Sequence, residues 1–262
     1  MAETGTFTVP SYADLAGKVA VVTGGSKGIG AAACRLLSAN RARVAVVARD
    51  PHGIDAVVGQ LRRDGGEAIG VSADMTSLAD IERLRERVES ELGATDVLIP
   101  YAGGFGRHTP ILEISEQEWR EVIDVNLTST FLTFKAFLPG MVERRRGAIV
   151  TMASNAGRFL DINTTASYAA AKAGVVMFTR HVAREVGPHG VRVNCVAPAT
   201  VISERVGRIL SETRIEEIAA LAPLGRIGQP EDVALATLFL ASDSASWLTG
   251  VTLDIAGGRI ML

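Results

Sequence analysis

Seven short runs of apolar, largely β-branched residues recur along the chain, and longer stretches with helical spacing lie between them. The apolar runs span residues 19–22, 44–47, 68–71, 96–99, 148–151, 191–196 and 251–255. Runs that are apolar throughout are typical of strands covered on both faces, as in parallel sheets. The clearest helical stretches span residues 29–39, 78–92 and 233–240. This alternation, with right-handed crossovers, predicts an α/β fold, in which helices cover both faces of one doubly wound, seven-stranded parallel sheet.

The length of the chain fits a single domain. It has 262 residues, of which 47% are hydrophobic and 21% charged, and this is enough apolar material to bury one large core. No repeat, low-complexity tract or Pro/Gly linker divides it. We therefore expect residues 1–16 to form a loose leader and residues 17–262 to form one domain. The spacing of apolar residues over about 200–222 is typical of an amphipathic lid over a site or, equally, of plain surface helices.

Charge and cysteine content exclude several classes of protein. The 27 Lys and Arg residues are balanced by 29 Asp and Glu, for a formal net charge of −2, so there is no basic surplus to bind nucleic acid or acidic membranes. No signal peptide and no run of about 18 uncharged apolar residues is found. Cys34 and Cys195 are too few for a disulfide scaffold, and the four histidines lack the paired spacing of metal ligands. We expect a cytoplasmic protein with no metal, no membrane span and no nucleic-acid partner.

The first predicted strand leads directly into a glycine-rich loop and then into a helix. The loop reads Thr-Gly-Gly-Ser-Lys-Gly-Ile-Gly over residues 23–30. Glycines let a backbone turn sharply and approach a pyrophosphate closely, and the free N–H groups of the following helix bind phosphate oxygens. A glycine-rich turn alone is weak evidence, but in this position between strand and helix the loop predicts the phosphate cradle of a dinucleotide.

Further landmarks follow the loop in order. They are Asp74 after the third strand, Ala102-Gly103 after the fourth, Asn126, Ser154 after the fifth, Tyr168-Ala-Ala-Ala-Lys172, Pro198 after the sixth, residues 223–230 and Gly257-Gly258. With the loop spacing T-G-x-x-x-G-x-G, they make the chain resemble the short-chain dehydrogenase/reductase family over nearly its whole length. The resemblance implies a single-domain Rossmann fold, hydride transfer between an NAD(P)(H) nicotinamide and a small carbonyl or alcohol substrate, and assembly as a homotetramer or homodimer.

The resemblance also assigns site residues. Tyr168 would act as general acid or base on the reacting oxygen, and Ser154 would bind that oxygen. Asn126 would hold a water that links Lys172 to solvent. Because Tyr168 and Lys172 lie four residues apart, they share one face of a helix, and the ammonium is expected to lower the pKa of the phenol. The expected cofactor contacts are Gly24, Ser26, Lys27, Gly28, Ile29, Gly30, Arg49, Asp74, Met75, Ala102, Gly103, Tyr168, Lys172, Pro198, Val201 and Ser203.

The end of the second strand bears on the choice of dinucleotide. NAD-binding folds place an acid there for the adenosine ribose, whereas NADP-binding folds place a cation near the 2′-phosphate. By the family pattern Ala48 occupies the acid position and Arg49 follows it, while Lys27 adds a second cation. Because Arg pairs with phosphate in a bidentate fork, this predicts NADP(H) rather than NAD(H). The alternative is that both side chains are ordinary solvated cations.

The chain departs from the family pattern after the fourth strand, where Asn-Asn-Ala-Gly is replaced by Pro100-Tyr101-Ala-Gly. Pro100 lacks a backbone N–H and Tyr101 adds a bulky ring. The sequence leaves open whether this ring enters the cofactor pocket or packs outward. Two smaller departures, Ala199 for Gly and Ser203 for Thr, lie where the nicotinamide carboxamide is expected.

Three functions remain open from the sequence. The preferred one is an NADP(H)-dependent ketone reductase or alcohol dehydrogenase whose mainly apolar pocket is formed by Phe105, Phe159, Leu160 and Ile162. An enzymatic alternative is a 3-oxoacyl-acyl-carrier-protein reductase acting on a carrier-bound substrate, since the segments around Tyr168 and over residues 223–230 resemble those enzymes most. An alternative of another class is a dinucleotide-binding sensor or scaffold that has lost catalysis.

Overall fold

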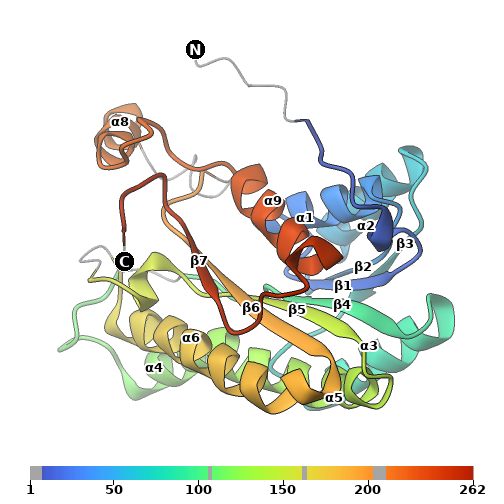
Figure 1. Cartoon of the computed structure of the whole chain (residues 1–262). Coiled ribbons are helices and arrows are strands. Elements are labelled where there is room, and N and C mark those ends of the chain that lie inside the picture. The colour runs from blue at the N-terminus through green and yellow to red at the C-terminus, as the bar shows by residue number, and fades with distance from the viewer. Residues whose placement is uncertain (1–7, 106–107, 161–163, 203–210, 262) are drawn as a thin grey trace.

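The computed structural model describes residues 8–105, 108–160, 164–202 and 211–261 (Figure 1). In this part of the chain seven strands form one parallel sheet in the order β3-β2-β1-β4-β5-β6-β7. The strands are β1 (Val19–Thr23), β2 (Arg43–Ala48), β3 (Ala68–Ser72), β4 (Thr95–Pro100), β5 (Gly147–Met152), β6 (Val191–Pro198) and β7 (Thr252–Ile255). The strand order reverses between β1 and β4, which confirms the doubly wound sheet. In such sheets ligands bind beyond the carboxyl ends of the strands at this switch point.

Helices cover both faces of the sheet, as predicted. One face is covered by α1 (Gly28–Ala39), α2 (Pro51–Arg63) and α9 (Pro230–Ala241). The other face is covered by α3 (Leu78–Glu91), α5 (Ser129–Glu143) and α6 (Ala166–Val186). Figure 1 shows α1, α2 and α9 above the sheet and α5 and α6 below it, with α4 (Glu116–Ile123) beside α6 and α8 (Glu212–Ala220) at one end.

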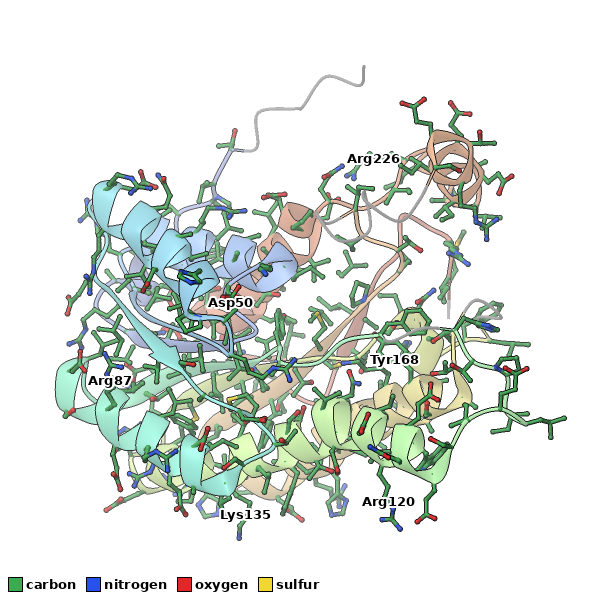
Figure 2. The ribbon with its side chains drawn as sticks, turned by 180° about the vertical axis from the view of Figure 1, so that it is seen from behind. Asp50, Arg87, Arg120, Lys135, Tyr168 and Arg226 are labelled. Carbon is green, nitrogen blue, oxygen red and sulfur yellow. The ribbon has the colours of Figure 1, made fainter. Side chains whose placement is uncertain are left out.

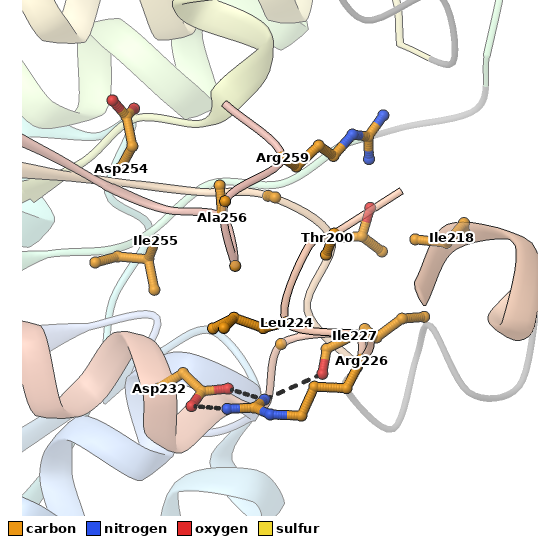
Figure 3. A pocket seen from close by; sticks show the side chains of 15 residues that line it. Thr200, Ile218, Leu224, Arg226, Ile227, Asp232, Asp254, Ile255, Ala256 and Arg259 are labelled. Carbon is orange, nitrogen blue, oxygen red and sulfur yellow. Dashed lines mark hydrogen bonds and ion pairs between the residues drawn. The ribbon is translucent and has the colours of Figure 1, made fainter. Parts of the chain in front are cut away.

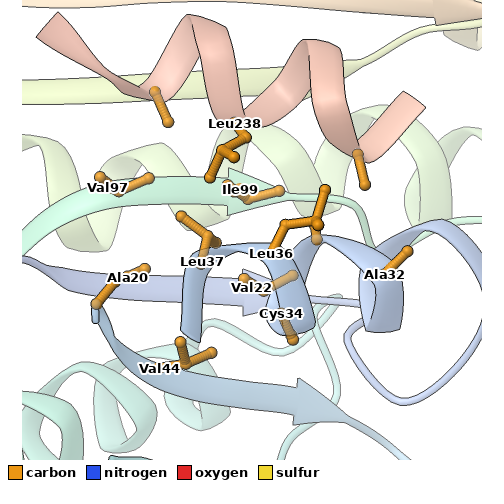
Figure 4. Packing of buried hydrophobic residues seen from close by; sticks show 14 of the residues in the cluster. Ala20, Val22, Ala32, Cys34, Leu36, Leu37, Val44, Val97, Ile99 and Leu238 are labelled. Carbon is orange, nitrogen blue, oxygen red and sulfur yellow. The ribbon is translucent and has the colours of Figure 1, made fainter. Parts of the chain in front are cut away.

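Alternation of side chains along the buried strands divides the core into two layers. In β1, Ala20 and Val22 face the layer under α1 and α9, whereas Val19 and Val21 face the layer under α3 and α5; all four are fully buried. Figure 4 shows the first layer, in which Leu238 of α9 packs over the strands beside α1. Because both faces of every central strand are covered, these strands are mainly apolar rather than alternately polar.

The segment before β1 is attached to the domain from Pro10 onward. The Asn40 side chain at the end of α1 accepts a hydrogen bond from the Tyr12 amide (2.6 Å) and donates one to the Pro10 carbonyl (3.1 Å). Leu15 is fully buried in the core layer under α1, and Asp14 forms an ion pair with Lys18 at 2.9 Å. A loose leader over all of residues 1–16 is therefore wrong for residues 10–15, because one asparagine side chain and one buried leucine hold them in place.

Candidate active site

The glycine-rich loop turns tightly at the carboxyl end of β1. Gly24 has φ of +67°, and a Cβ added to it would lie 2.7 Å from the Tyr101 carbonyl oxygen. A Cβ on Gly30 would collide with the Gly24 carbonyl oxygen. Lys27 precedes α1 without a side-chain cap, so that the first amides of the helix have no side-chain acceptor. These are the features of a cradle for a pyrophosphate, in which only glycine fits and open amides point outward.

Thr23, which the sequence analysis did not single out, ties the glycine-rich loop to the loop after β4. Its buried hydroxyl accepts a hydrogen bond from the Ala102 amide at 2.9 Å. The two loops that flank the switch point are thereby joined by a side chain at the last position of β1. A hydroxyl residue that ends an otherwise apolar buried strand is the sequence signal for this role, because a buried hydroxyl needs a hydrogen-bond partner.

The Tyr101 ring points away from the dinucleotide cradle. It lies in the core layer under α9, and its hydroxyl is 2.5 Å from the Thr237 hydroxyl of α9. Burial raises the pKa of this phenol. The side chain thus packs into the core between β4 and α9, while Tyr101 also contributes to the lining of the cavity described below.

Replacing Tyr101 by Phe is expected to lower the free energy of unfolding by about 1 kcal/mol, because the Thr237 hydroxyl loses one hydrogen-bond partner. Dinucleotide affinity should not change, since the lost oxygen faces α9. Denaturant unfolding and a fluorescence titration with the dinucleotide measure the two quantities. A dissociation constant raised more than about fivefold would show that the hydroxyl also acts on the cradle.

One cavity of about 180 Å³ lies beyond the carboxyl ends of β4, β5 and β6. It brings together Ser154, Tyr168 and Lys172, three of the four residues predicted to be catalytic. Six of the predicted cofactor contacts also line it, Tyr168 and Lys172 among them. Its full lining is Ile29, Tyr101, Gly103, Gly104, Met152, Ala153, Ser154, Tyr168, Lys172, Pro198, Ala199 and Val201.

Two local caps fix the side chains that face each other across this cavity. Thr165 caps α6 by accepting a hydrogen bond from the Tyr168 amide at 3.2 Å, which places Tyr168 in the first turn. Ser154 caps the short turn Asn155–Gly157 that follows β5. The Ser154 hydroxyl donates to Asn155 Oδ1 at 3.1 Å and accepts from the Ala156 amide at 3.3 Å, and its interaction with the Tyr168 phenol acts to lower the pKa of that phenol. The Phe105 ring packs edge-on against the Tyr168 ring with the centroids 5.4 Å apart, which supplies one apolar wall.

Lys172 is buried below Tyr168, with only 4% of its surface exposed. Its ammonium donates a hydrogen bond to the Met152 carbonyl at 2.9 Å and lies 5.6 Å from the centre of the Tyr168 ring. Burial lowers the pKa of Lys172 to about 8, because a charged amine loses hydration there. The Met152 carbonyl was not predicted, since any residue type can present a backbone oxygen.

The expected lowering of the Tyr168 pKa is wrong for this structure. Burial raises the pKa of the phenol, and the hydrogen bond from Ser154 only partly offsets that effect. Spacing of four residues correctly placed the ammonium beside the ring, but it does not reveal how deeply the phenol is buried. Desolvation of the phenolate therefore dominates its titration.

Asn126 lies outside the lining of this cavity, behind Gly103 and Gly104. It belongs to a π-helical turn, Asp124–Thr128, between α4 and α5 and is fully buried. Its Nδ2 donates to the Gly104 and Val122 carbonyls, both at 3.0 Å, and its Oδ1 accepts from the Gly104 amide at 3.1 Å. A Cβ on Gly103 would lie 2.7 Å from this Oδ1 and 3.6 Å from the Lys172 ammonium, so both atoms face the missing side chain of Gly103.

The region where the adenosine of the dinucleotide is predicted to bind contains an ion pair that the sequence analysis did not predict. The Lys27 ammonium lies 3.2 Å from an Asp50 carboxylate oxygen, and this contact helps to hold the pKa of Asp50 below its usual value. Asp50 also caps α2 by accepting from the His52 amide. Arg49 is exposed at the end of β2. Both predicted cations are thus exposed, and each has an acidic neighbour: Lys27 pairs with Asp50, and the charge of Arg49 helps to lower the pKa of Asp74. Figure 2 labels Asp50 beside α2 and Tyr168 on the α6 side.

Three other predicted contacts have different outcomes. Asp74 accepts hydrogen bonds from the Thr76 amide and hydroxyl at 2.9 and 2.7 Å, which lower the pKa of Asp74. The Met75 side chain is buried in the core layer under α3. Ser203 lies outside the described residues, as do Ile162 and residues 203–210 of the expected lid.

A second cavity of about 340 Å³ adjoins the first, and Ala199 lines both. Figure 3 shows it between α8, the loop that carries Arg226 and the end of β7. The Arg226 guanidinium forms an ion pair with Asp232 at 2.6 Å. The sequence analysis did not predict this cavity, because its walls come from segments far apart in the chain.

The described residues contain no group of His, Cys, Asp or Glu side chains that is suited to a metal ion. Among the same residues, no helix has the length and apolar character needed to cross a membrane.

Comparison with known proteins identifies the class to which this fold and site belong. The family model described as Enoyl-(Acyl carrier protein) reductase matches residues 24–259. The chain belongs to the short-chain dehydrogenase/reductase family, as its sequence landmarks predicted. It is an oxidoreductase of CH–OH and C=O groups that uses a nicotinamide cofactor.

Several relatives cover almost the whole chain. The 3-oxoacyl-[acyl-carrier-protein] reductase FabG of Escherichia coli is 37% identical, over 94% of this chain and 98% of the relative. The D-threitol dehydrogenase of Mycolicibacterium smegmatis is also 37% identical, over 93% of each protein. Among solved structures, a 3-oxoacyl-[acyl-carrier protein] reductase from Brucella melitensis has a TM-score of 0.91 and 33% identity, covering 98% of both chains.

Proposed function

We propose that this chain is an NADPH-dependent reductase that converts a ketone into a secondary alcohol. The observation that carries the proposal is the cavity in which a Ser154 hydroxyl, a Tyr168 hydroxyl and a buried Lys172 ammonium meet. This cavity lies at the switch point, beside a glycine cradle suited to a pyrophosphate.

The cofactor, when bound, supplies hydride to the carbonyl carbon. Tyr168 donates its phenolic proton to the carbonyl oxygen, so that hydride and proton together complete the alcohol. The raised pKa of Tyr168 keeps the phenol protonated at neutral pH, which suits reduction. Ser154 donates a hydrogen bond to the same oxygen as negative charge develops there.

Lys172 and Asn126 support this proton transfer. The ammonium of Lys172 stabilises the phenolate that Tyr168 becomes, and it is well placed to bind the hydroxyls of the nicotinamide ribose. Both N–H groups of Asn126 are engaged by carbonyls, but an amide oxygen has two lone pairs. We assign the second lone pair of its Oδ1 to a water between Asn126 and Lys172, beside Gly103, through which Tyr168 is reprotonated.

Reduction is expected to become slower as the pH rises through about 8. The pKa of Lys172 is lowered to about 8 from its ordinary value of 10.5, so the ammonium is neutralised there and no longer stabilises the phenolate. Between these two values the unfolded state binds more protons than the folded state, so the contribution of Lys172 to stability increases with pH. A fall in kcat/KM caused by this group would thus not come from unfolding. Measuring kcat/KM and Tm together checks both signs; a flat kcat/KM to about pH 9.5 would contradict the prediction.

NADP(H) is favoured over NAD(H) by the charges at the adenosine end. Ala48 offers no carboxylate to the ribose, whereas Arg49 is exposed and unobstructed by burial. Lys27 lies on the same side, but it forms an ion pair with Asp50 at 3.2 Å. We therefore assign the 2′-phosphate chiefly to Arg49 and a weaker contribution to Lys27. The remaining predicted contacts, including Pro198 and Val201, would hold the nicotinamide end.

The substrate class is tested by a panel. The Phe105 ring packs against Tyr168, and Phe159 and Leu160 are exposed a few residues after Ser154. These apolar side chains favour an apolar ketone as the substrate. The names of the relatives favour a 3-oxoacyl thioester on an acyl carrier as the second candidate. Small ketones, acetoacetyl thioesters and a polyol are each supplied with NADPH or NADP⁺, and absorbance at the nicotinamide band is followed. NADPH binding without turnover of any of them would instead favour a sensor or scaffold.

We also propose that the chain works as a homotetramer or homodimer in the cytoplasm. Trp247 is 97% and Met261 79% exposed, and large apolar side chains in such positions are commonly covered by another subunit. Cys34 and Cys195 are buried free thiols, which suits a reducing compartment. Light scattering after gel filtration determines the subunit number.

A further inference from the structure

A buried ion pair joins the turn that carries Ser154 to the edge strand β7. The Arg158 guanidinium donates a hydrogen bond to Asp254 Oδ2 at 3.0 Å, and its Nε lies 2.7 Å from Oδ1. Only 13% of the Arg158 side chain and 17% of the Asp254 side chain are exposed. The proposed chemistry does not use either charge, and the two residues are 96 positions apart in the chain.

The turn between Ser154 and Arg158 is attached on its other side to α6. A Cβ on Gly157 would lie 2.5 Å from the Lys172 carbonyl carbon and 2.6 Å from the Ala173 nitrogen, so the turn rests directly on the backbone that bears Lys172. Within the turn, the Gly157 amide donates to the Ser154 carbonyl at 3.0 Å. Glycine contact with α6 and the Arg158 ion pair thus hold the turn from two sides.

Asp254 connects this turn to the opposite wall of the cavity. In the β6–β7 ladder, Asp254 pairs with Ala197 and Ile255 pairs with Pro198. The Ala199 amide donates to the Ile255 carbonyl at 3.1 Å, and Pro198 and Ala199 line the cavity that holds Tyr168. Asp254 itself lines the larger neighbouring cavity (Figure 3). The ion pair therefore spans from the Ser154 turn to the strand end that closes the far side of the site.

We propose that Arg158 is a positioning residue, which acts through Asp254 to hold the Ser154 hydroxyl in place against Tyr168. This inference rests on the proposed reductase function for its kinetic consequence. A displacement of about 1 Å in a group that binds the reacting oxygen costs on the order of 100-fold in rate, so a rigid bridge across the site has a direct effect on turnover. A buried pair also makes each partner costly to remove singly, because the remaining charge stays desolvated.

The test compares Arg158→Met, Asp254→Asn and the double variant Arg158→Met/Asp254→Asn. Each single variant is expected to lower kcat by about 10- to 100-fold and to lower Tm, while the dissociation constant for NADPH changes less than about twofold. The double variant leaves no unpaired charge, so its Tm should recover. Its kcat should stay low, since the bridge is still missing. Arg158→Lys, which keeps a positive charge that can pair with Asp254, should have a higher kcat than Arg158→Met.

Asp96→Asn is the matched control. Asp96 is a buried carboxylate whose partner is Arg146, and it also accepts from the Val19 amide, so it lies at the amino ends of the strands, opposite the site. Its replacement should lower Tm without changing kcat at a temperature well below Tm. If kcat follows Tm across all variants, including the recovered double variant and this control, the pair is merely structural and the proposal is wrong.

Amide hydrogen exchange over residues 153–160 gives a readout that needs no turnover. Arg158→Met should accelerate exchange of the Gly157, Arg158 and Phe159 amides, which are bonded within the turn, and Asp96→Asn should not. Unchanged exchange in Arg158→Met would overturn the proposal. Absence of wild-type turnover with every carbonyl would refute the proposed function, and the exchange result alone would then decide whether Arg158 positions the turn.

Discussion

Replacing Tyr168 by Phe is expected to lower kcat for ketone reduction by about 10²- to 10⁴-fold, the range that a general acid contributes. The variant keeps the ring that packs against Phe105 and loses only the phenolic oxygen. NADPH affinity should therefore change less than about twofold, because no charge is added or removed. Turnover is followed by nicotinamide absorbance and affinity by fluorescence titration.

Tyr101→Phe is the matched control for this experiment. It removes the same oxygen from another buried tyrosine, whose hydroxyl bonds Thr237 on the α9 side. It should keep wild-type kcat while losing a little stability, so a general effect of deleting a buried phenol is separated from loss of the acid. Turnover of Tyr168→Phe within about threefold of wild type would remove Tyr168 from the mechanism and leave Ser154 and Lys172 without their proposed proton donor.

Replacing Arg49 by Ala is expected to lower kcat/KM for NADPH by about 10- to 100-fold, the equivalent of about 1.5–3 kcal/mol for a hydrogen bond to a charged group. Values with NADH should be nearly unchanged, because NADH lacks the 2′-phosphate. The measurement is kcat/KM for both cofactors with one ketone. Equal or better use of NADH by the wild-type protein would contradict the assignment of the phosphate to Arg49.

Asp50→Asn tests the same end of the site in the opposite direction. Asparagine also caps a helix, so α2 should be preserved, while Lys27 loses its acidic partner at 3.2 Å. The preference for NADPH over NADH should then rise. Arg63→Ala, which removes an exposed cation from the last turn of α2, is the control for a general change in charge. Because Arg63→Ala changes the net charge in the opposite direction, a preference for NADPH that falls by a similar factor in Arg63→Ala would show that long-range charge, rather than the Lys27–Asp50 contact, sets it.

The strands and the glycine-rich loop were predictable because each depends on residues close together in the chain. β1 was predicted at residues 19–22 and observed at Val19–Thr23, since burial on both faces demands a run of apolar residues. The tight turn at Gly24 and the close approach at Gly30 were similarly marked by their glycines. The four-residue spacing of Tyr168 and Lys172 placed both on one side of α6, and the structure puts them in one cavity.

The pKa values of the same residues were not predictable from the sequence. Spacing indicated that Lys172 would make the Tyr168 phenol more acidic, whereas burial raises its pKa. How far a phenol or ammonium is removed from water depends on every element that covers it, here β5, β6 and the loops after β4 and β5. Desolvation is a sum over that whole surrounding, so it exists only once the elements are packed.

Read alone, the amino-acid sequence determined which segments become strands and helices, where phosphate can approach the backbone, and which side chains share a helix face. Only the tertiary structure decided where the Tyr101 ring packs, which acidic residue pairs with Lys27, and that Arg158 pairs with Asp254. The physical reason is the separation along the chain over which each interaction acts. Hydrophobic periodicity and backbone preference act over a few residues, whereas the Tyr101–Thr237 and Arg158–Asp254 contacts join positions 136 and 96 residues apart and form only when whole helices and strands pack together.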